Sequence, residues 1–132
     1  MPSFYFRKLV RDQVLQRCLD DPKVTTEYRI LDPIEFKKEL VAKVHEEADE
    51  IPVLDTANDE VLSEIADVQA VIDSLVESYG YTKDDIAAAQ AKKAAKNGVF
   101  KDRAYIEKVD LTDDSEWTEY FRAAPDKYEE IA

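Results

Sequence analysis

Two acidic segments organise this chain: residues 45–50, His45-Glu46-Glu47-Ala48-Asp49-Glu50, and residues 64–67, Glu64-Ile65-Ala66-Asp67. If each segment is helical, it carries two acids on one face, three residues apart: Glu47 with Glu50, and Glu64 with Asp67. Carboxylates this close repel one another, and they repel more strongly when partly buried, so the arrangement calls for a cation. Oxygen ligands favour a hard ion, and the two segments therefore predict a site for Mg²⁺ or Mn²⁺.

The spacing alone is a weak signal, because 30 of the 132 residues are Asp or Glu and acids three residues apart occur nine times. What distinguishes the two central pairs is their context. Both lie in long amphipathic segments, and the connection between them is short enough to make two helices antiparallel neighbours. Most of the other pairs have no apolar periodic helix around them and are expected to be solvated surface.

Capping signals define the predicted helices. Asp32-Pro33 is expected to start a helix that runs to about Glu50, and Asn58 or Asp59 to cap the next one. That second helix carries the apolar face Val61, Leu62, Ile65, Val68, Ile72 and Leu75. Gly80 suits the position after its end, and Thr82 with Asp85 resembles a capping box that starts a third long helix ending near Lys96, before Asn97-Gly98. A short helix from Leu9 to Leu19 is expected to precede them.

Two other segments are rich in β-branched and aromatic residues. Residues 24–31 and 104–109 are predicted to be extended and to pair as a small two-stranded β element. The predicted fold is therefore an all-α antiparallel bundle in a single domain, residues 1–132, with its core at 6–103 and a docking tail at 110–132. The tail carries aromatic residues among charges, a pattern that suits docking onto the body or onto another subunit.

The composition excludes several classes of function. A formal net charge of −12 argues against general nucleic-acid binding, because the phosphate backbone would be repelled and no basic stripe compensates. The single cysteine, Cys18, cannot form an internal disulfide, and no segment has the apolar length of a signal peptide or membrane span. A cytoplasmic protein without membrane contact is expected.

Two groups of cationic and amide side chains are candidates for holding an anion. Lys8 and Arg11 lie three residues apart and either bind phosphate or are two solvated cations. Lys93, Lys96 and Asn97 share one face at the end of the third long helix. They can bind an anionic ligand together, or the two lysines can simply complement the negative end of the helix dipole.

The chain resembles the all-α nucleoside triphosphate pyrophosphatases, the superfamily of MazG-like proteins and phosphoribosyl-ATP pyrophosphohydrolase. Three motifs between residues 6 and 103 carry the resemblance: the acidic segments, Lys8-Leu9-Val10-Arg11-Asp12, and Lys96-Asn97-Gly98-Val99-Phe100 with Arg103. The second and third are similar to motifs of the phosphoribosyl-ATP pyrophosphohydrolase-like branch. The chain departs from that branch at Gln13, where Lys is usual, and at Asn97 and Val99 in the glycine segment.

The resemblance implies a tight homodimer, or a dimer of dimers, that hydrolyses a nucleotide between its α and β phosphates to a monophosphate and pyrophosphate. It implies Mg²⁺ ligands at Glu47, Glu50, Glu64 and Asp67. Glu46, beside them, is the candidate for positioning or deprotonating the attacking water. Phosphates are then expected to be held by Lys93, Lys96, Asn97 and Arg103, with Lys8 and Arg11 as weaker candidates.

Three alternatives remain open from the sequence. The first is a non-enzymatic acidic helical dimer that serves as a binding or regulatory module, whose cluster is solvated or binds Ca²⁺, although no EF-hand loop is present. The second is a di-iron bundle, which needs Glu-x-x-His pairs, whereas residue 42 is Ala. The third is phosphoribosyl-ATP hydrolysis in place of the clearance of unwanted nucleotides.

Overall fold

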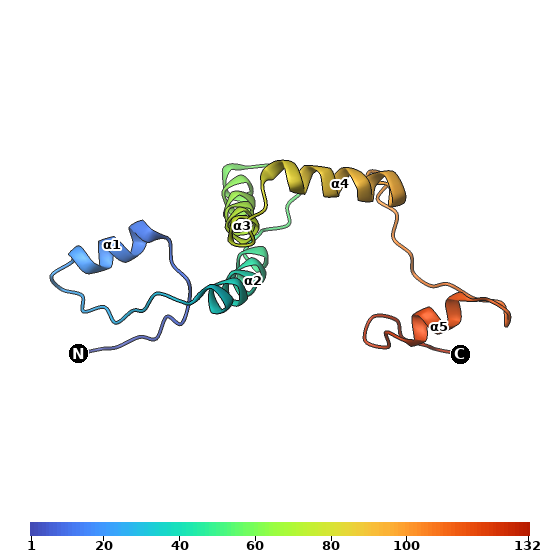
Figure 1. The fold of residues 1–132 in the computed structure, drawn as a ribbon, viewed down its shortest axis with the longest axis horizontal. Helices are drawn as coiled ribbons and strands as arrows, with labels where there is room; N and C mark the ends of the chain where they lie inside the picture. The colour runs from blue at the N-terminus through green and yellow to red at the C-terminus, as the bar shows by residue number, and fades with distance from the viewer. The chain divides into compact units, whose positions relative to one another are not determined.

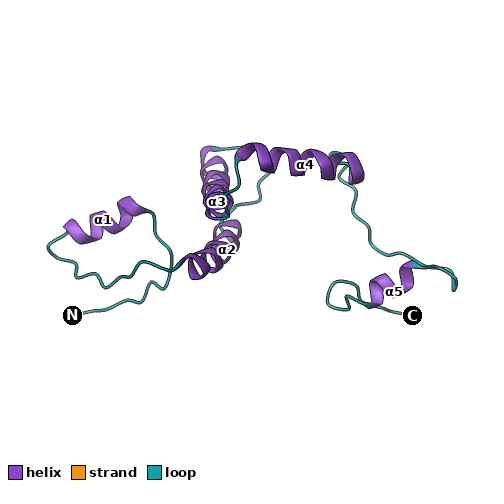
Figure 2. Cartoon of the chain, viewed as in Figure 1, coloured by secondary structure: helices purple, strands orange, loops and turns teal.

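A computed structural model describes residues 1–132 and contains five helices and no strand (Figures 1 and 2). The helices are α1 (Asp12–Asp20), α2 (Pro33–Asp49), α3 (Asp59–Ser78), α4 (Lys83–Asn97) and α5 (Trp117–Arg122). The chain divides into two compact units, Met1–Ala95 and Lys96–Ala132, and each is described by itself. The helical fold class expected from the sequence is confirmed.

Side-chain caps start α2 and α3 where the sequence predicts them. The Asp32 carboxylate accepts a hydrogen bond from the Glu35 backbone N–H at 2.9 Å, and Pro33 occupies the first helical position. The Asn58 side chain accepts from the Val61 N–H at 2.8 Å and so caps α3. Each cap satisfies one of the N–H groups that the first turn of a helix leaves without a partner.

The turn from α3 to α4 is also built from local signals. Gly80 has φ +78°, its N–H donates to the Glu77 carbonyl at 2.9 Å, and the Tyr81 N–H donates to the Val76 carbonyl at 3.1 Å, which is a Schellman motif. Thr82 and Asp85 then exchange reciprocal hydrogen bonds of 2.8 and 3.1 Å, which form the predicted capping box.

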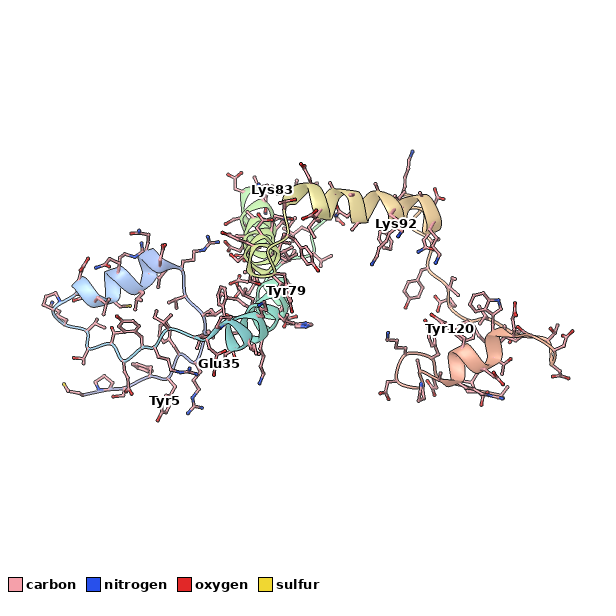
Figure 3. All side chains as sticks on the ribbon, in the orientation of Figure 1. Tyr5, Glu35, Tyr79, Lys83, Lys92 and Tyr120 are labelled. Atoms are coloured by element: carbon pink, nitrogen blue, oxygen red, sulfur yellow. The ribbon has the colours of Figure 1, made fainter.

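The packing of α2 against α3 forms the centre of the first unit (Figure 1). Leu40 on α2 and Val71 on α3 are its two buried apolar side chains, 4% and 9% exposed. Near the start of α2, Lys37 lies 4.9 Å from the ring centroid of Tyr79, which follows the end of α3 (Tyr79 is labelled in Figure 3). The start of one helix thus meets the end of the other, so the two helices are antiparallel.

Part of the predicted apolar face of α3 is not covered within this chain. Leu62 and Ile65 are 68% and 48% exposed, although the 3.6-residue period places them with the core positions. A single neighbouring helix can cover only a narrow stripe of α3. The sequence pattern correctly identified an apolar face on α3, but that face is wider than the stripe that α2 covers.

The first helix starts later than its apolar period suggests. Leu9 and Val10 precede α1, which begins at Asp12, and Arg11 has an extended backbone at the N-cap position. The Arg11 guanidinium donates a 3.0 Å hydrogen bond to Asp67 on α3. The residues before α1 are thus attached to the α2–α3 pair rather than wound into an added helical turn.

The expectation of a small two-stranded β element is wrong. Residues 24–31 and 104–109 are both without regular secondary structure (Figure 2). Strand propensity reflects how well side chains fit a half-buried sheet surface, and it does not create a strand without a partner. In the first segment Arg29 instead forms two 2.8 Å hydrogen bonds with Glu35 on α2, which lower the pKa of Glu35 and raise that of Arg29.

Aromatic side chains gather around α5 in the second unit. Phe121 lies 4.8 Å from Tyr128 and 5.5 Å from Tyr120, and Trp117 meets Tyr120 at 5.5 Å, all between ring centroids (Tyr120 is labelled in Figure 3). Arg122 donates a 2.6 Å hydrogen bond to Glu130 and closes the segment around this cluster. The tail does form the expected helical turn, and its docking onto another surface stays a prediction.

We predict that Leu40→Ala destabilises the first unit by about 2 to 5 kcal/mol, because it removes the most buried apolar side chain at the α2–α3 contact. Leu54→Ala is the matched control, since Leu54 is 53% exposed in the connection between these helices, and it is expected to change stability by less than about 0.5 kcal/mol. Urea unfolding followed by circular dichroism measures both. Equal losses in the two variants would show that the α2–α3 contact is not the core of the unit.

Candidate metal centre

Three carboxylates converge where the end of α2 lies against the first half of α3. One oxygen from each of Glu47, Glu64 and Asp67 lies within 4.8 Å of the other two. Glu47 comes from α2, while Glu64 and Asp67 lie almost one turn apart on α3, so the antiparallel packing of the helices brings the two acidic segments together. The structure thus joins three of the four predicted ligands.

Glu64, one of the three converging acids, has an unusual carboxylate oxygen. Its Oε2 atom is shielded from solvent and has no hydrogen-bond partner. A shielded carboxylate oxygen without a partner is costly, because the lost hydration is not replaced. A cation at the cluster would supply the missing interaction, which makes Glu64 the best structural indication that the residues present suit a metal ion.

The fourth predicted ligand, Glu50, stands at the edge of the cluster. Repulsion by Glu47 raises the pKa of Glu50, and so does the hydrogen bond that the protonated Glu50 carboxyl donates to Glu47, with smaller effects of burial, Glu64 and Glu46. The other carboxylates therefore repel Glu50, although its oxygens are not among the three that converge.

The donor set suits a small hard ion if the three carboxylates draw closer together. Magnesium binds oxygen at about 2.0 to 2.1 Å, so two oxygens on the same ion lie at most about 4.2 Å apart. At most one pair among three ligands of an octahedral ion is opposite, and adjacent oxygens lie about 3 Å apart, so the oxygens of Glu47, Glu64 and Asp67, within 4.8 Å of one another, would have to approach by up to about 2 Å. An ion would provide that attraction, whereas without it the three negative charges push apart.

Cationic side chains from before α1 already contact the acidic segments. Arg11 pairs with Asp67 at 3.0 Å and Lys8 pairs with Glu46 at 3.1 Å. Both pairs are largely exposed, which limits each to at most about 1 kcal/mol. Lys8 and Arg11, predicted only as weak phosphate ligands, therefore lie beside the candidate metal centre.

Lys43 is a member of this site that the sequence prediction missed. It lies 3.4 Å from Glu47 and 3.8 Å from Glu46, on the same helix, and its side chain is only 19% exposed. The spacing to Glu47 is four residues, the separation at which opposite charges on one helix face meet. That spacing is a signal in the sequence, but Lys–Glu pairs at this separation are common on solvent-exposed helix faces and do not by themselves indicate a site.

The other predicted phosphate-binding residues lie further along the chain. Lys93 is on α4 in the first unit, and no hydrogen bond or ion pair joins it to Glu47, Glu64 or Asp67. Lys96 and Asn97 form the end of α4, and Arg103 follows with a left-handed φ of +56°; these three belong to the second unit. Their part in binding phosphate stays a prediction.

Comparisons of this chain with protein-family models, with curated proteins and with solved structures found no match. No helix has the length and apolar character needed to cross a membrane. The case for a function therefore depends on the acidic cluster and the cations around it.

We predict that Glu50→Gln raises the melting temperature of the ion-free protein at neutral pH, because it removes a charge that Glu47 repels. The pKa of Glu50 is higher in the folded state than its ordinary 4.5, so the folded state binds more protons and loses stability as pH rises from 4.5 through the raised pKa. The benefit of Glu50→Gln should accordingly grow across that interval. Melting in a chelator measures it, with the exposed loop variant Glu27→Gln as control; equal shifts in both variants would contradict the prediction.

Proposed function

We propose that this protein is a Mg²⁺- or Mn²⁺-dependent hydrolase that cleaves a nucleotide between its α and β phosphates, releasing a nucleoside monophosphate and pyrophosphate. The observation that carries the proposal is the convergence of Glu47, Glu64 and Asp67, together with the unpartnered Oε2 of Glu64. Glu50 completes the proposed ligand set. When bound, the ion neutralises the phosphates and lowers the pKa of a bound water.

The residues around the centre suit a polyanionic substrate. Glu46 adjoins the ligands on α2 and is the proposed base or orienting group for water, with Lys8 and Lys43 holding its carboxylate at 3.1 and 3.8 Å. Arg11 and Lys8 provide positive charge within reach of the acidic segments. A carboxylate-held cation flanked by cationic side chains can attract a phosphoanhydride from two sides.

Lys93, Lys96, Asn97 and Arg103 are proposed as further phosphate-binding residues, as the family resemblance implies. Lys96 and Asn97 close the C-terminal end of α4, and the φ of +56° at Arg103 costs strain in a residue with a side chain. Clearance of unwanted nucleotides and hydrolysis of phosphoribosyl-ATP both fit this chemistry, and a panel of substrates distinguishes them.

A non-enzymatic role is the second candidate. The ion pairs of Arg11 with Asp67 and of Lys8 with Glu46 neutralise part of the acidic surface without any metal. A protein whose cations already compensate its acids can serve as a binding or regulatory module. Metal-dependent release of pyrophosphate separates the two candidates.

The reaction is tested by incubating the protein with nucleoside triphosphates and phosphoribosyl-ATP in the presence of Mg²⁺ and identifying the products. We expect a monophosphate and pyrophosphate, and no reaction in a chelator. Glu47→Ala and Asp67→Ala should each lower turnover by about two orders of magnitude or more, since each removes a proposed metal ligand. Circular dichroism checks that the helices persist.

The matched control is Glu116→Ala, which removes an acid from outside the acidic cluster and should leave turnover unchanged. Release of orthophosphate alone would refute the proposed bond cleavage. Full activity of Glu47→Ala on an accepted substrate would refute the proposed role of the cluster.

We further propose that the protein assembles as a homodimer, or as a dimer of dimers, through the α2–α3 pair. Large apolar side chains on both helices remain in contact with water: Ile34, Val41, Leu62 and Ile65 are 81, 45, 68 and 48% exposed. Only Leu40 and Val71 are buried as apolar core, which is little for a unit of this size. A second copy would cover these positions by adding two helices to the pair.

Light scattering at micromolar concentration should therefore give at least twice the 15.1 kDa chain mass. Leu62→Asp should shift the protein to monomer by placing a charge in the proposed interface, whereas Val53→Asp, at a 97% exposed position in the α2–α3 connection, should not. A monomeric wild-type mass would refute the assembly.

A further inference from the structure

The residues before α1 are attached to the acidic segments through Asp67 itself. Arg11 at the N-cap position of α1 donates to the Asp67 carboxylate at 3.0 Å, and Asp67 is one of the three converging acids. Three residues earlier, Lys8 pairs with Glu46, the neighbour of Glu47, at 3.1 Å. One short segment therefore touches both acidic segments, on α2 and on α3.

The same carboxylate thus has two prospective cationic partners. An ion at the cluster needs lone pairs of Asp67, and the positive guanidinium of Arg11 and a divalent ion repel each other at this short range. The Arg11–Asp67 pair is mostly exposed, with side chains 63% and 39% accessible, so it is a weak interaction that a multiply coordinated ion can displace.

Building on the proposed function, we propose that Arg11 is an internal counter-ion for the ion-free centre, which a divalent metal displaces from Asp67, removing one of the two attachments that hold the segment around Lys8 and Arg11 to the α2–α3 pair. The loosened segment, still attached through Lys8 and Glu46, then carries the free Arg11 guanidinium beside the metal, where a phosphate group can take the place of Asp67. The positive charge of Arg11 would in this way become available to the substrate only after the metal ion has bound.

The competition has a direct thermodynamic consequence. Removing Arg11 removes the ligand that the metal must displace, so Arg11→Ala should bind Mn²⁺ about two- to fivefold more tightly than the wild type, the range expected for loss of one exposed ion pair. Arg17→Ala makes the same change in charge on α1, at a residue without an ion pair, and should leave affinity nearly unchanged. Isothermal titration calorimetry with Mn²⁺ alone, on the full chain, measures all three proteins.

A second readout follows the segment itself. Limited trypsin digestion, analysed by mass spectrometry, should cleave after Lys8 faster when Mn²⁺ is present, with cleavage after Lys101 in the second unit as an internal reference. This readout uses the wild type only, so it does not depend on the change in net charge that Arg11→Ala introduces.

The outcomes separate this inference from the function on which it rests. If the wild type takes up no Mn²⁺, the proposed metal centre fails and the counter-ion role fails with it. If the wild type binds Mn²⁺ but Arg11→Ala binds it equally or more weakly, or if Mn²⁺ leaves cleavage after Lys8 unchanged or slower, Arg11 supports the Asp67 ligand instead of competing for it. The metal centre would then stand and the displacement would be refuted.

Discussion

The antiparallel contact of α2 with α3 is the interaction on which the rest of the first unit depends. It buries Leu40 and Val71, and it is also what brings Glu47 beside Glu64 and Asp67. Apolar burial at the middle of the pair therefore works against carboxylate repulsion at one end. The acids can remain close only because the helices that carry them are held together elsewhere, and that opposition is the physical condition a cation would relieve.

Local charge compensation shows how the ion-free chain tolerates this repulsion. Lys43 lies between Glu46 and Glu47, Lys8 reaches Glu46 and Arg11 reaches Asp67. Glu64 is the exception, because one of its oxygens is shielded and lacks any partner. Compensation thus reaches Glu47 and Asp67 but not Glu64, and Glu50 at the edge, whose pKa the neighbouring acids raise, has no cationic partner either. This asymmetry favours an ion at the centre over an acidic surface that is already satisfied.

The exposed apolar side chains are the basis of the proposed assembly. A pair of helices buries a stripe on each, while the apolar faces of α2 and α3 are wider than that stripe, as Leu62 and Ile65 demonstrate. A four-helix arrangement made from two copies is the smallest change that covers them, and it would place two acidic clusters in one assembly. The same two helices, α2 and α3, would then carry the apolar core, the proposed interface and the acidic cluster.

Sequence by itself determined the features that neighbouring residues control. The cap at Asp32, the glycine after α3 at Gly80 and the capping box at Thr82 were predicted correctly, and of the two caps offered for α3 the structure uses Asn58; each consists of hydrogen bonds over a few residues. The acidic pairs were also readable, since helical spacing places them on a face. Such features depend on residues that are close in sequence, so the sequence alone reveals them.

Only the tertiary structure decided which groups meet. It joined Glu47 to Glu64 and Asp67, left Glu50 at the edge, and paired Arg11 with Asp67 across 56 positions in sequence. It also left residues 24–31 and 104–109 without the strand that their composition suggested, because a strand exists only where a partner offers backbone hydrogen bonds. Contacts between distant residues depend on packing directions that no local pattern encodes.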